Sequence, residues 1–220
     1  MDHFKPALFN FLAELKKNNT REWFTENKDR YKAEVQAPLL EFISAFSVPL
    51  GTISPHLKAD PRPVGGSMFR IYRDVRFSKD KSPYKTHAAA QFRHRDGRDV
   101  HAPGFYLHLE PGNVFMGAGI WHPAGASLGA IRTAIIDNPV RWREAVANLS
   151  LGGESLKRGP RGVDPDHPMI EDLKRKDFVS LTMSSKTAAC RSGFLGDFTA
   201  ACEHAAPMMR FLSEALDLEF

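Results

Sequence analysis

A β-hairpin signature in the middle of the chain constrains the fold more than any other feature. Residues 105–110 alternate apolar and polar side chains, and residues 114–120 form a second strand-like run. The Pro-Gly pair at 111–112 is a two-residue turn that would pair Glu110 with Asn113. An isolated hairpin is only marginally stable in water, so we expect these strands to belong to a larger antiparallel sheet.

Helical and strand-like patterns flank this hairpin in a definite order. Apolar spacing predicts a first helix that ends near residues 16–19, and Thr20 is a suitable N-cap for a longer helix that Pro38 would kink. The other expected elements are strands at 68–72, 86–94 and 177–183, and helices at 125–137, 139–148, 169–175 and 194–217. This order predicts one α+β domain over residues 1–220, an antiparallel sheet meander packed with N-terminal and C-terminal helices.

Composition removes several classes of protein. Hydrophobic residues make up 42% of the chain and charged residues 25%, which is ordinary for a soluble globular protein. Cys190 and Cys202 are the two cysteines of the sequence, too few for a disulfide framework or a cysteine-based zinc site. No apolar stretch reaches the roughly 20 residues of a membrane helix, and the N-terminus lacks a signal-peptide pattern. We therefore expect a cytoplasmic protein with no membrane partner.

Positive charge is concentrated between residues 70 and 85. This segment holds six Lys or Arg side chains against two Asp, a surplus of four that equals the formal net charge of +4 for the whole chain. The six cations, which we predict to be ligand-binding residues, are Arg70, Arg73, Arg76, Lys79, Lys81 and Lys85. Arginine contacts phosphate or carboxylate in a bidentate manner and lysine supplies a point charge. The alternative is a solvated edge loop whose cations pair with Asp74 and Asp80.

The two faces of the hairpin differ in chemistry. One face is apolar and is expected to join the core: Phe105, Leu107, Leu109, Val114, Met116, Ala118 and Ile120. The other carries Tyr106, His108, Glu110, Phe115, Gly117, Gly119 and Trp121. Its two glycines would leave room above the sheet, as in the floor of a pocket. A half-exposed sheet face, or one covered by a helix, is the alternative interpretation.

The candidate catalytic residues come from this second face and its C-terminal continuation. His108 or His122 would serve as a general acid or base, because imidazole titrates near neutral pH. Tyr106 or Glu110 would orient the imidazole.

The histidines show no metal-binding motif. Five of them fall in a short stretch: His87, His94, His101, His108 and His122. Neither an HExxH pattern nor a His-carboxylate pair at helical spacing occurs among them. The sequence therefore predicts no metal and no cofactor, with assembly of a histidine cluster in space as the alternative.

Several blocks of sequence together resemble a known family. They are NTREWF at 19–24 with Asn27 and Tyr31, FRIYRDVRFSKDKSPYKT at 69–86, YLHL at 106–109, GAGIWHP at 117–123, and Ile131 with Arg132. This pattern is similar to the uncharacterised bacterial and fungal family called domain of unknown function 2461, over roughly residues 5 to 215. The resemblance implies a soluble protein that is one domain throughout. It implies no reaction, cofactor or catalytic residue.

Three functional hypotheses follow from the sequence. The first is a binding protein for a small anionic ligand, held by the basic segment. The second is an enzyme that acts on such a ligand with a histidine acid or base. The third is a nucleic-acid or protein interaction module; a nucleic-acid partner is disfavoured, because the positive excess is small and local, but it stays an alternative.

Overall fold

An antiparallel sheet lies at the centre of the structure. The computed structural model describes residues 2–95 and 102–220, and within these ranges five strands follow the order β1-β2-β3-β5-β4. The strands are β1 Ala88–Arg93, β2 Gly104–Glu110, β3 Asn113–Ile120, β4 Leu151–Gly152 and β5 Phe178–Ser184. The predicted hairpin is confirmed, since Glu110 pairs with Asn113 and His108 with Phe115. The late strand at 177–183 is also confirmed as β5, which pairs with β3.

The first fifty residues are helical, as the sequence predicted. They form α1 Pro6–Lys17, α2 Arg21–Glu26, α3 Lys28–Tyr31, the π-helical turn η1 Lys32–Gln36 and α4 Ala37–Ile53. The hydroxyl of Thr20 accepts a hydrogen bond from the N–H of Trp23 at 3.3 Å, which confirms the predicted N-cap. Pro38 is the second residue of α4, which continues directly from η1, and the N–H of Ala37 just before it bonds to the carbonyl of Lys32, five residues earlier. The expected long helix is therefore interrupted by a wider turn just before its proline.

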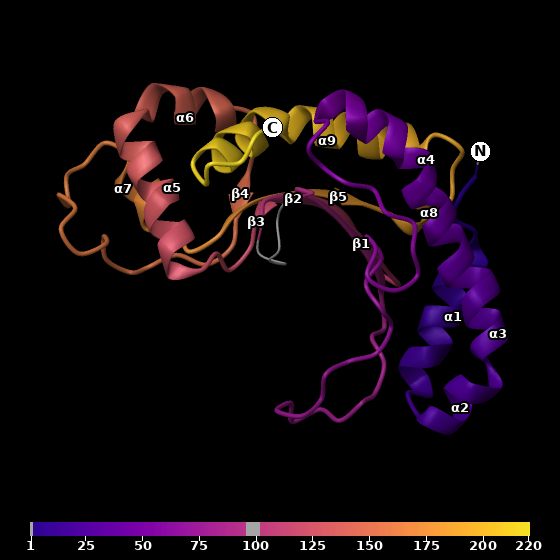
Figure 1. The fold of residues 1–220 in the computed structure, drawn as a ribbon. Helices are drawn as coiled ribbons and strands as arrows, with labels where there is room; N and C mark the ends of the chain where they lie inside the picture. The colour runs from indigo at the N-terminus through magenta and orange to yellow at the C-terminus, as the bar shows by residue number, and fades with distance from the viewer. Residues whose placement is uncertain (1, 96–101) are drawn as a thin grey trace.

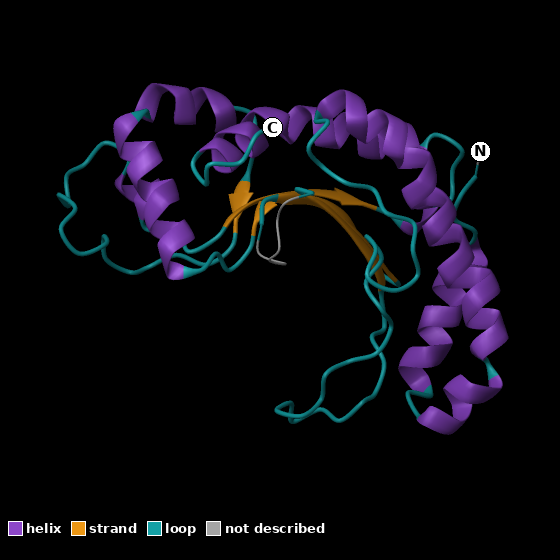
Figure 2. Ribbon diagram, in the orientation of Figure 1, coloured by secondary structure: helices purple, strands orange, loops and turns teal. Residues whose placement is uncertain are grey.

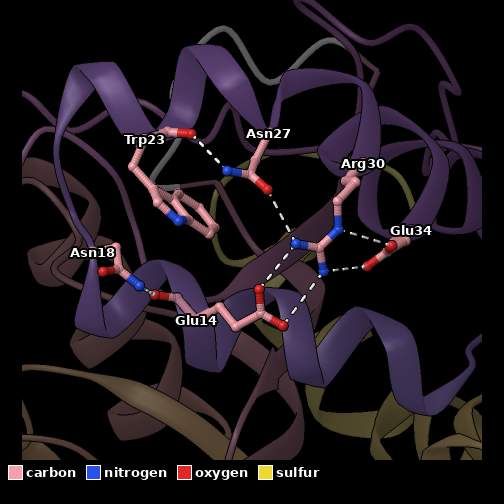
Figure 3. A network of polar contacts seen from close by, with 6 residues as sticks. All are labelled: Glu14, Asn18, Trp23, Asn27, Arg30 and Glu34. Atoms are coloured by element: carbon pink, nitrogen blue, oxygen red, sulfur yellow. Dashed lines mark hydrogen bonds and ion pairs between the residues drawn. The ribbon is translucent and has the colours of Figure 1, made fainter.

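Arg30 ties these helices together (Figure 3). Its guanidinium donates to Glu14 on α1 at 2.9 Å and to Glu34 on η1 at 3.2 Å. The side chain of Asn27 accepts a further bond from Arg30 and donates to the carbonyl of Trp23. The two carboxylates raise the pKa of Arg30 above its ordinary value, so the guanidinium stays charged at any physiological pH.

The second half of the chain adds the remaining helices. They are α5 Gly125–Asp137, α6 Pro139–Val146, α7 Ile170–Leu173, α8 Lys186–Ala189 and α9 Phe194–Glu214. Four of these lie where the sequence predicted helices. The sequence did not predict α8 or β4, because four and two residues are too short to show a periodic pattern.

The sheet is arched, and α4 and α9 run along its outer, convex side (Figure 1). The predicted core face of the hairpin turns toward these helices, and Phe105, Leu107 and Leu109 are completely buried. Phe92 on β1 packs edge-on against Phe46 of α4. This is the α+β arrangement that the sequence predicted, with helices packed on one face of an antiparallel sheet. In the part of the chain that the structure describes, no helix has both the length and the apolar character needed to cross a membrane.

Residues 68–72 do not form the strand that the sequence predicted. Two isolated bridges occur there, Met68 with Ala90 and Tyr72 with Tyr84. Between these bridges the chain changes its partner from β1 to residues 83–85, because the N–H of Phe69 donates to Ala89 whereas the carbonyl of Ile71 accepts from Lys85. A ladder that changes partner after two residues cannot continue as a regular strand.

Candidate functional site

The basic segment folds as an irregular arm, which we define as residues 69–86 and call the basic arm. Its two sides are joined by backbone bonds from the N–H of Arg73 to the carbonyl of Pro83, at 2.9 Å, and from the N–H of Lys85 to the carbonyl of Ile71, at 2.8 Å. Figure 2 shows the arm as a loop that extends away from the strands on the concave side of the sheet. The basic arm is thus attached to the edge of β1 at its base and projects from it.

Two residues of the N-terminal helical region fix the position of the arm. The side-chain amide of Asn19 donates to the carbonyl of Tyr84 at 2.9 Å and accepts from its N–H at 3.1 Å, as a neighbouring strand would. The ring of Phe24 stacks on the ring of Tyr84 with centroids 4.1 Å apart. Both residues belong to the first block of the resemblance noted above, so this block and the basic arm are in direct contact.

Two of the six predicted anion-binding cations already have carboxylate partners. Arg76 forms an ion pair with Asp74 at 2.7 Å, and Arg73 forms one with Asp80. The hydrogen bonds from Arg76 lower the pKa of Asp74 to about 2. Bonds from Ser82 and then from Arg73 lower the pKa of Asp80 to about 2. For these two arginines the geometry matches the alternative interpretation, in which the acids of the arm pair with its cations.

The other cations divide into two groups. Lys81 donates to the carbonyl of Val75 at 3.0 Å, and Lys79 is exposed in the outer part of the arm. Arg70 and Lys85 lie at its base, where the ammonium of Lys85 donates to the carbonyl of Arg70 at 2.8 Å. Burial and the charge of Arg70 together lower the pKa of Lys85. Within the described ranges, neither Arg70 nor Lys85 forms an ion pair with an acidic side chain.

A chain of hydrogen bonds begins where the arm meets the hairpin; we call its four residues, Thr86, Glu110, His108 and Tyr106, the polar row. The hydroxyl of Thr86 donates to Glu110 at 2.9 Å, and the other oxygen of Glu110 lies 3.4 Å from Nε2 of His108. The hydroxyl of Tyr106 lies 3.1 Å from Nδ1 of His108. A neutral imidazole with its proton on Nε2 satisfies both contacts, donating to Glu110 and accepting from Tyr106.

Burial sets the protonation of this row. His108 is 7% exposed, and burial lowers its pKa more than the neighbouring Glu110 raises it. The pKa of Tyr106 rises to about 12, first through burial and then through the charge of Glu110. Burial tends to raise the pKa of Glu110, but its bonds from Thr86 and His108 hold it below the usual value. At neutral pH the row therefore contains a neutral imidazole, a phenol and a carboxylate.

His87 belongs to this site although the sequence assigned it no catalytic role. Its ring lies against the ring of His108, with centroids 4.5 Å apart. Burial and the neighbouring His108 lower its pKa to about 4. Its ring nitrogens hydrogen-bond to no residue that the structure describes. The signal available in the sequence was its position directly between the basic segment and the following strand.

His122 lies apart from the basic arm and the polar row. Phe115, the partner of His108, is five residues from the end of β3 at Ile120, or about 17 Å along the strand, and His122 follows beyond that end. The N–H of His122 donates to the buried carboxylate of Asp177 at 2.7 Å, and its backbone φ is 48°. The structure thus brings Tyr106, His108 and Glu110 together with the base of the arm, and leaves His122 at the other end of the hairpin.

The two glycines of the polar face differ in what they do. Gly119 has φ of 124°, and an added Cβ would lie 1.9 Å from the carbonyl oxygen of Phe178. Its conformation and its close contact with β5 both require glycine. At Gly117 an added Cβ would meet only ordinary contacts, with Leu181 at 3.4 Å and Tyr106 at 3.5 Å. Gly117 could therefore accept a side chain where Gly119 could not, but it is itself buried beside Leu181 and Tyr106 and leaves no open space above the sheet.

The polar row lies on the concave side of the sheet, away from two hollows of the described structure. A cavity of about 10 Å³ between β3 and α9 is lined by Phe105, Met116 and Cys202 on the opposite side of the sheet. A shallow depression beside the C-terminus involves His56 and Arg210 and is also remote from the row.

The described histidines, cysteines and carboxylates do not assemble into a metal site. Within residues 2–95 and 102–220, no three of them lie close enough together to hold a metal ion. His101, the remaining histidine of the predicted group, lies outside the described residues.

Comparison with known proteins gives one match. A family model described as "Conserved hypothetical protein (DUF2461)" matches residues 7–211. No curated protein matches the chain, and no solved structure does. The match includes the Asn19 and Phe24 anchor, the whole basic arm and the polar row. The chain therefore belongs to the DUF2461 family of conserved hypothetical proteins.

Proposed function

We propose that the protein binds a small ligand with a phosphate or carboxylate group, and that Arg70 and Lys85 hold this group. One observation carries the proposal. These two cations are neighbours at the base of the basic arm, and no described acidic side chain pairs with either. Of the other four, Arg73 and Arg76 have carboxylate partners within the arm, and Lys79 and Lys81 lie in its outer part, where Lys81 donates to the carbonyl of Val75. The proposed anion contacts are therefore two of the six predicted cations.

The electrostatics of Lys85 support an anion at this position. Burial and the nearby Arg70 both disfavour its charged form, which is why its pKa is lowered. A bound phosphate or carboxylate would reverse this effect, because an opposite charge within hydrogen-bond distance favours the ammonium. The planar guanidinium of Arg70 would supply the bidentate contact and Lys85 the point charge.

The anchoring of the arm supports binding at its base in particular. Asn19 and Phe24 hold Tyr84, the residue directly before Lys85, through two hydrogen bonds and a ring stack. A cation fixed in this way loses less conformational entropy on binding than a cation on a free loop. Lys79 also has no carboxylate partner among the described residues, but it is exposed in the outer arm and lacks this support.

Titration with inorganic phosphate tests the proposal. Calorimetry and thermal unfolding should detect phosphate binding to the natural protein, with a stabilisation of about 1.4 kcal/mol at ten times the dissociation constant. The double variant Arg70→Gln/Lys85→Met should lose this stabilisation. Arg76→Gln/Lys79→Met is the matched control, because it also removes one arginine and one lysine of the arm, but not those at its base. Equal phosphate binding by all three proteins, or none by the natural protein, would contradict the proposal.

A second candidate function is proton transfer on the bound ligand, and the state of His87 favours it. A neutral imidazole with no described hydrogen-bond partner lies beside the arm, whereas both nitrogens of His108 face Tyr106 and Glu110. His87 is thus better placed than His108 to accept a proton from a ligand. Turnover of chromogenic phosphate and carboxylate esters that is lost in His87→Gln, with phosphate affinity retained, would support an enzyme. Absence of turnover in both proteins would leave the binding function alone.

We also propose that the protein acts in the cytoplasm. Cys190 and Cys202 are free thiols, which suits the reducing cytoplasm expected from the sequence.

A further inference from the structure

The concave face changes from charged to apolar across its strands. One row of the antiparallel register runs from Ala89 on β1 through His108 and Phe115 to Met183 on β5. Phe69, at the base of the basic arm, extends this row beyond β1, because its N–H donates to the carbonyl of Ala89. Cations and the polar row therefore lie at one end of the face, and β5 lies at the other.

The β5 end exposes apolar side chains. Leu181 is 46% exposed and Met183 is 65% exposed, and both lie on the concave face because they pair with Gly117 and Phe115. Neither β3 nor β5 contains a charged residue. Neighbouring exposed apolar side chains on a sheet face are typical of a surface that contacts an apolar group.

Gly117 joins the two ends. It lies between Tyr106 and Leu181 in the register, it is buried, and the side chains of these two residues lie closest to the position that a Cβ would take. A Cβ would fit there with ordinary contacts, so the fold itself does not require glycine at this position. Glycine inside a strand weakens it, and a strand glycine without a backbone reason often marks the approach of a ligand.

We propose that the ligand is a monomeric anionic amphiphile, whose head group binds to Arg70 and Lys85 and whose apolar chain crosses the sheet to Leu181 and Met183. The inference rests on the proposed function and specifies its ligand class. From residue 69 to β5 the face spans four strand spacings, about 19 Å, so a long alkyl chain or a similar apolar body would cover it. Phe69, Phe115 and Gly117 lie along this path.

Charge complementarity favours this occupant over a nucleic acid. A polyanion needs cations along its whole path, whereas the path across β3 and β5 offers none. A single anionic group at one end, followed by an apolar body, matches the distribution of charge on the face.

Alkyl phosphates of increasing chain length test the inference. Ethyl, octyl, dodecyl and tetradecyl phosphate are titrated by calorimetry, each below its micelle concentration. Affinity should rise with every methylene group, by at most the roughly fourfold that complete burial of a methylene gives. The uncharged octyl glucoside should bind at least tenfold more weakly than octyl phosphate.

Variants separate the head-group site from the chain site. Leu181→Glu and Met183→Glu should remove the gain in affinity from octyl to tetradecyl phosphate and leave the affinity for inorganic phosphate within twofold. Gly117→Val should weaken octyl phosphate more than ethyl phosphate, because the new side chain would contact Tyr106 and Leu181 and change the surface that the alkyl chain crosses. Val48→Glu is the matched control, because Val48 is an apolar residue 77% exposed on α4 at the convex side, and it should change neither affinity.

The possible failures are distinguishable. If inorganic phosphate does not bind, the proposed function fails. If phosphate binds but all alkyl phosphates bind equally, only the amphiphile inference fails. Binding to vesicles that contain phosphatidic acid, without binding to monomeric octyl phosphate, would assign the face to a membrane surface and overturn the inference. The inference would also be overturned if single-stranded DNA displaced octyl phosphate from Val48→Glu but did not bind to Leu181→Glu. That result would assign the concave face to nucleic acid.

Discussion

At the scale of one residue, the partly buried ring of His87 makes the stability of the protein depend on pH. Its pKa is lowered from an ordinary value of 6.5 to about 4, so between these pH values the unfolded chain binds a proton that the folded protein does not. The free energy of unfolding should therefore decrease as the pH falls from about 6.5 to about 4. Below pH 4 this contribution should become constant.

The variant His87→Gln should make the stability profile flatter over this pH range, as measured by urea unfolding at half-unit pH steps. His108 also has a lowered pKa, so the variant should keep part of the slope. NMR titration of the His87 ring protons gives the pKa directly. A value at or above 6.5 would show that the ring is not desolvated as the structure indicates.

Tyr106 gives a second prediction at this scale. Its hydroxyl is the described partner of Nδ1 of His108, and His108 is buried. Tyr106→Phe leaves a buried nitrogen without a partner, so the free energy of unfolding should fall by about 1–2 kcal/mol. Tyr72→Phe serves as control, because Tyr72 is half-exposed and should tolerate the change. A loss no larger than that of the control would mean that water replaces the hydroxyl.

At the scale of elements, the hairpin was predictable and the basic arm was not. Alternating side chains and a two-residue turn fix the register of β2 and β3, and with it the group of Tyr106, His108 and Glu110 on one face. The arm has no such periodicity, because its backbone bonds pass from β1 to its own return segment within three residues. Which of its cations are paired depends on that path, and the composition of the segment does not determine it.

Asn19 should control the order of the arm. Its amide makes both backbone bonds of Tyr84, 65 residues further along the chain, so Asn19→Ala removes both at once. Hydrogen exchange at the Tyr84 amide should accelerate by at least tenfold, since the exchange of a protected amide follows the local opening free energy. Phosphate affinity should fall as well, because Lys85 adjoins Tyr84.

The neighbouring Asn18 provides the control for this experiment. Its side chain donates to the carbonyl of Glu14 at the end of α1 and does not reach the arm. Asn18→Ala should leave the exchange rate of Tyr84 unchanged. If Asn19→Ala behaves like Asn18→Ala, the ring stack of Phe24 on Tyr84 holds the arm by itself.

For the molecule as a whole, the sequence predicted the α+β layout but not the meeting of arm and polar row. The layout follows from periodicity, since each predicted helix has an apolar stripe and the hairpin has one apolar face. The contacts of His87 with His108 and of Thr86 with Glu110 instead depend on how the arm returns to the sheet edge. This return is fixed by helices at the start of the chain, through contacts whose partners are about 65 residues apart.

Asp177 connects distant parts of the whole molecule in a similar way and gives the last prediction. It is completely buried, and its two oxygens accept from the N–H of His122 after β3, at 2.7 Å, and from the N–H of Glu154 after β4, at 2.8 Å. In Asp177→Asn one of these N–H groups would face an amide NH₂ in place of an acceptor. The free energy of unfolding should fall by about 2–3 kcal/mol, because a buried donor loses a bond to a charged acceptor.

Asp29→Asn is the control, because it removes a carboxylate that is almost fully exposed on α3, and it should leave stability unchanged. Since Asp177 joins β3, β4 and β5, circular dichroism and tryptophan fluorescence should report the same lowered urea midpoint. A change seen by only one probe would show that the carboxylate holds a single loop and not the sheet.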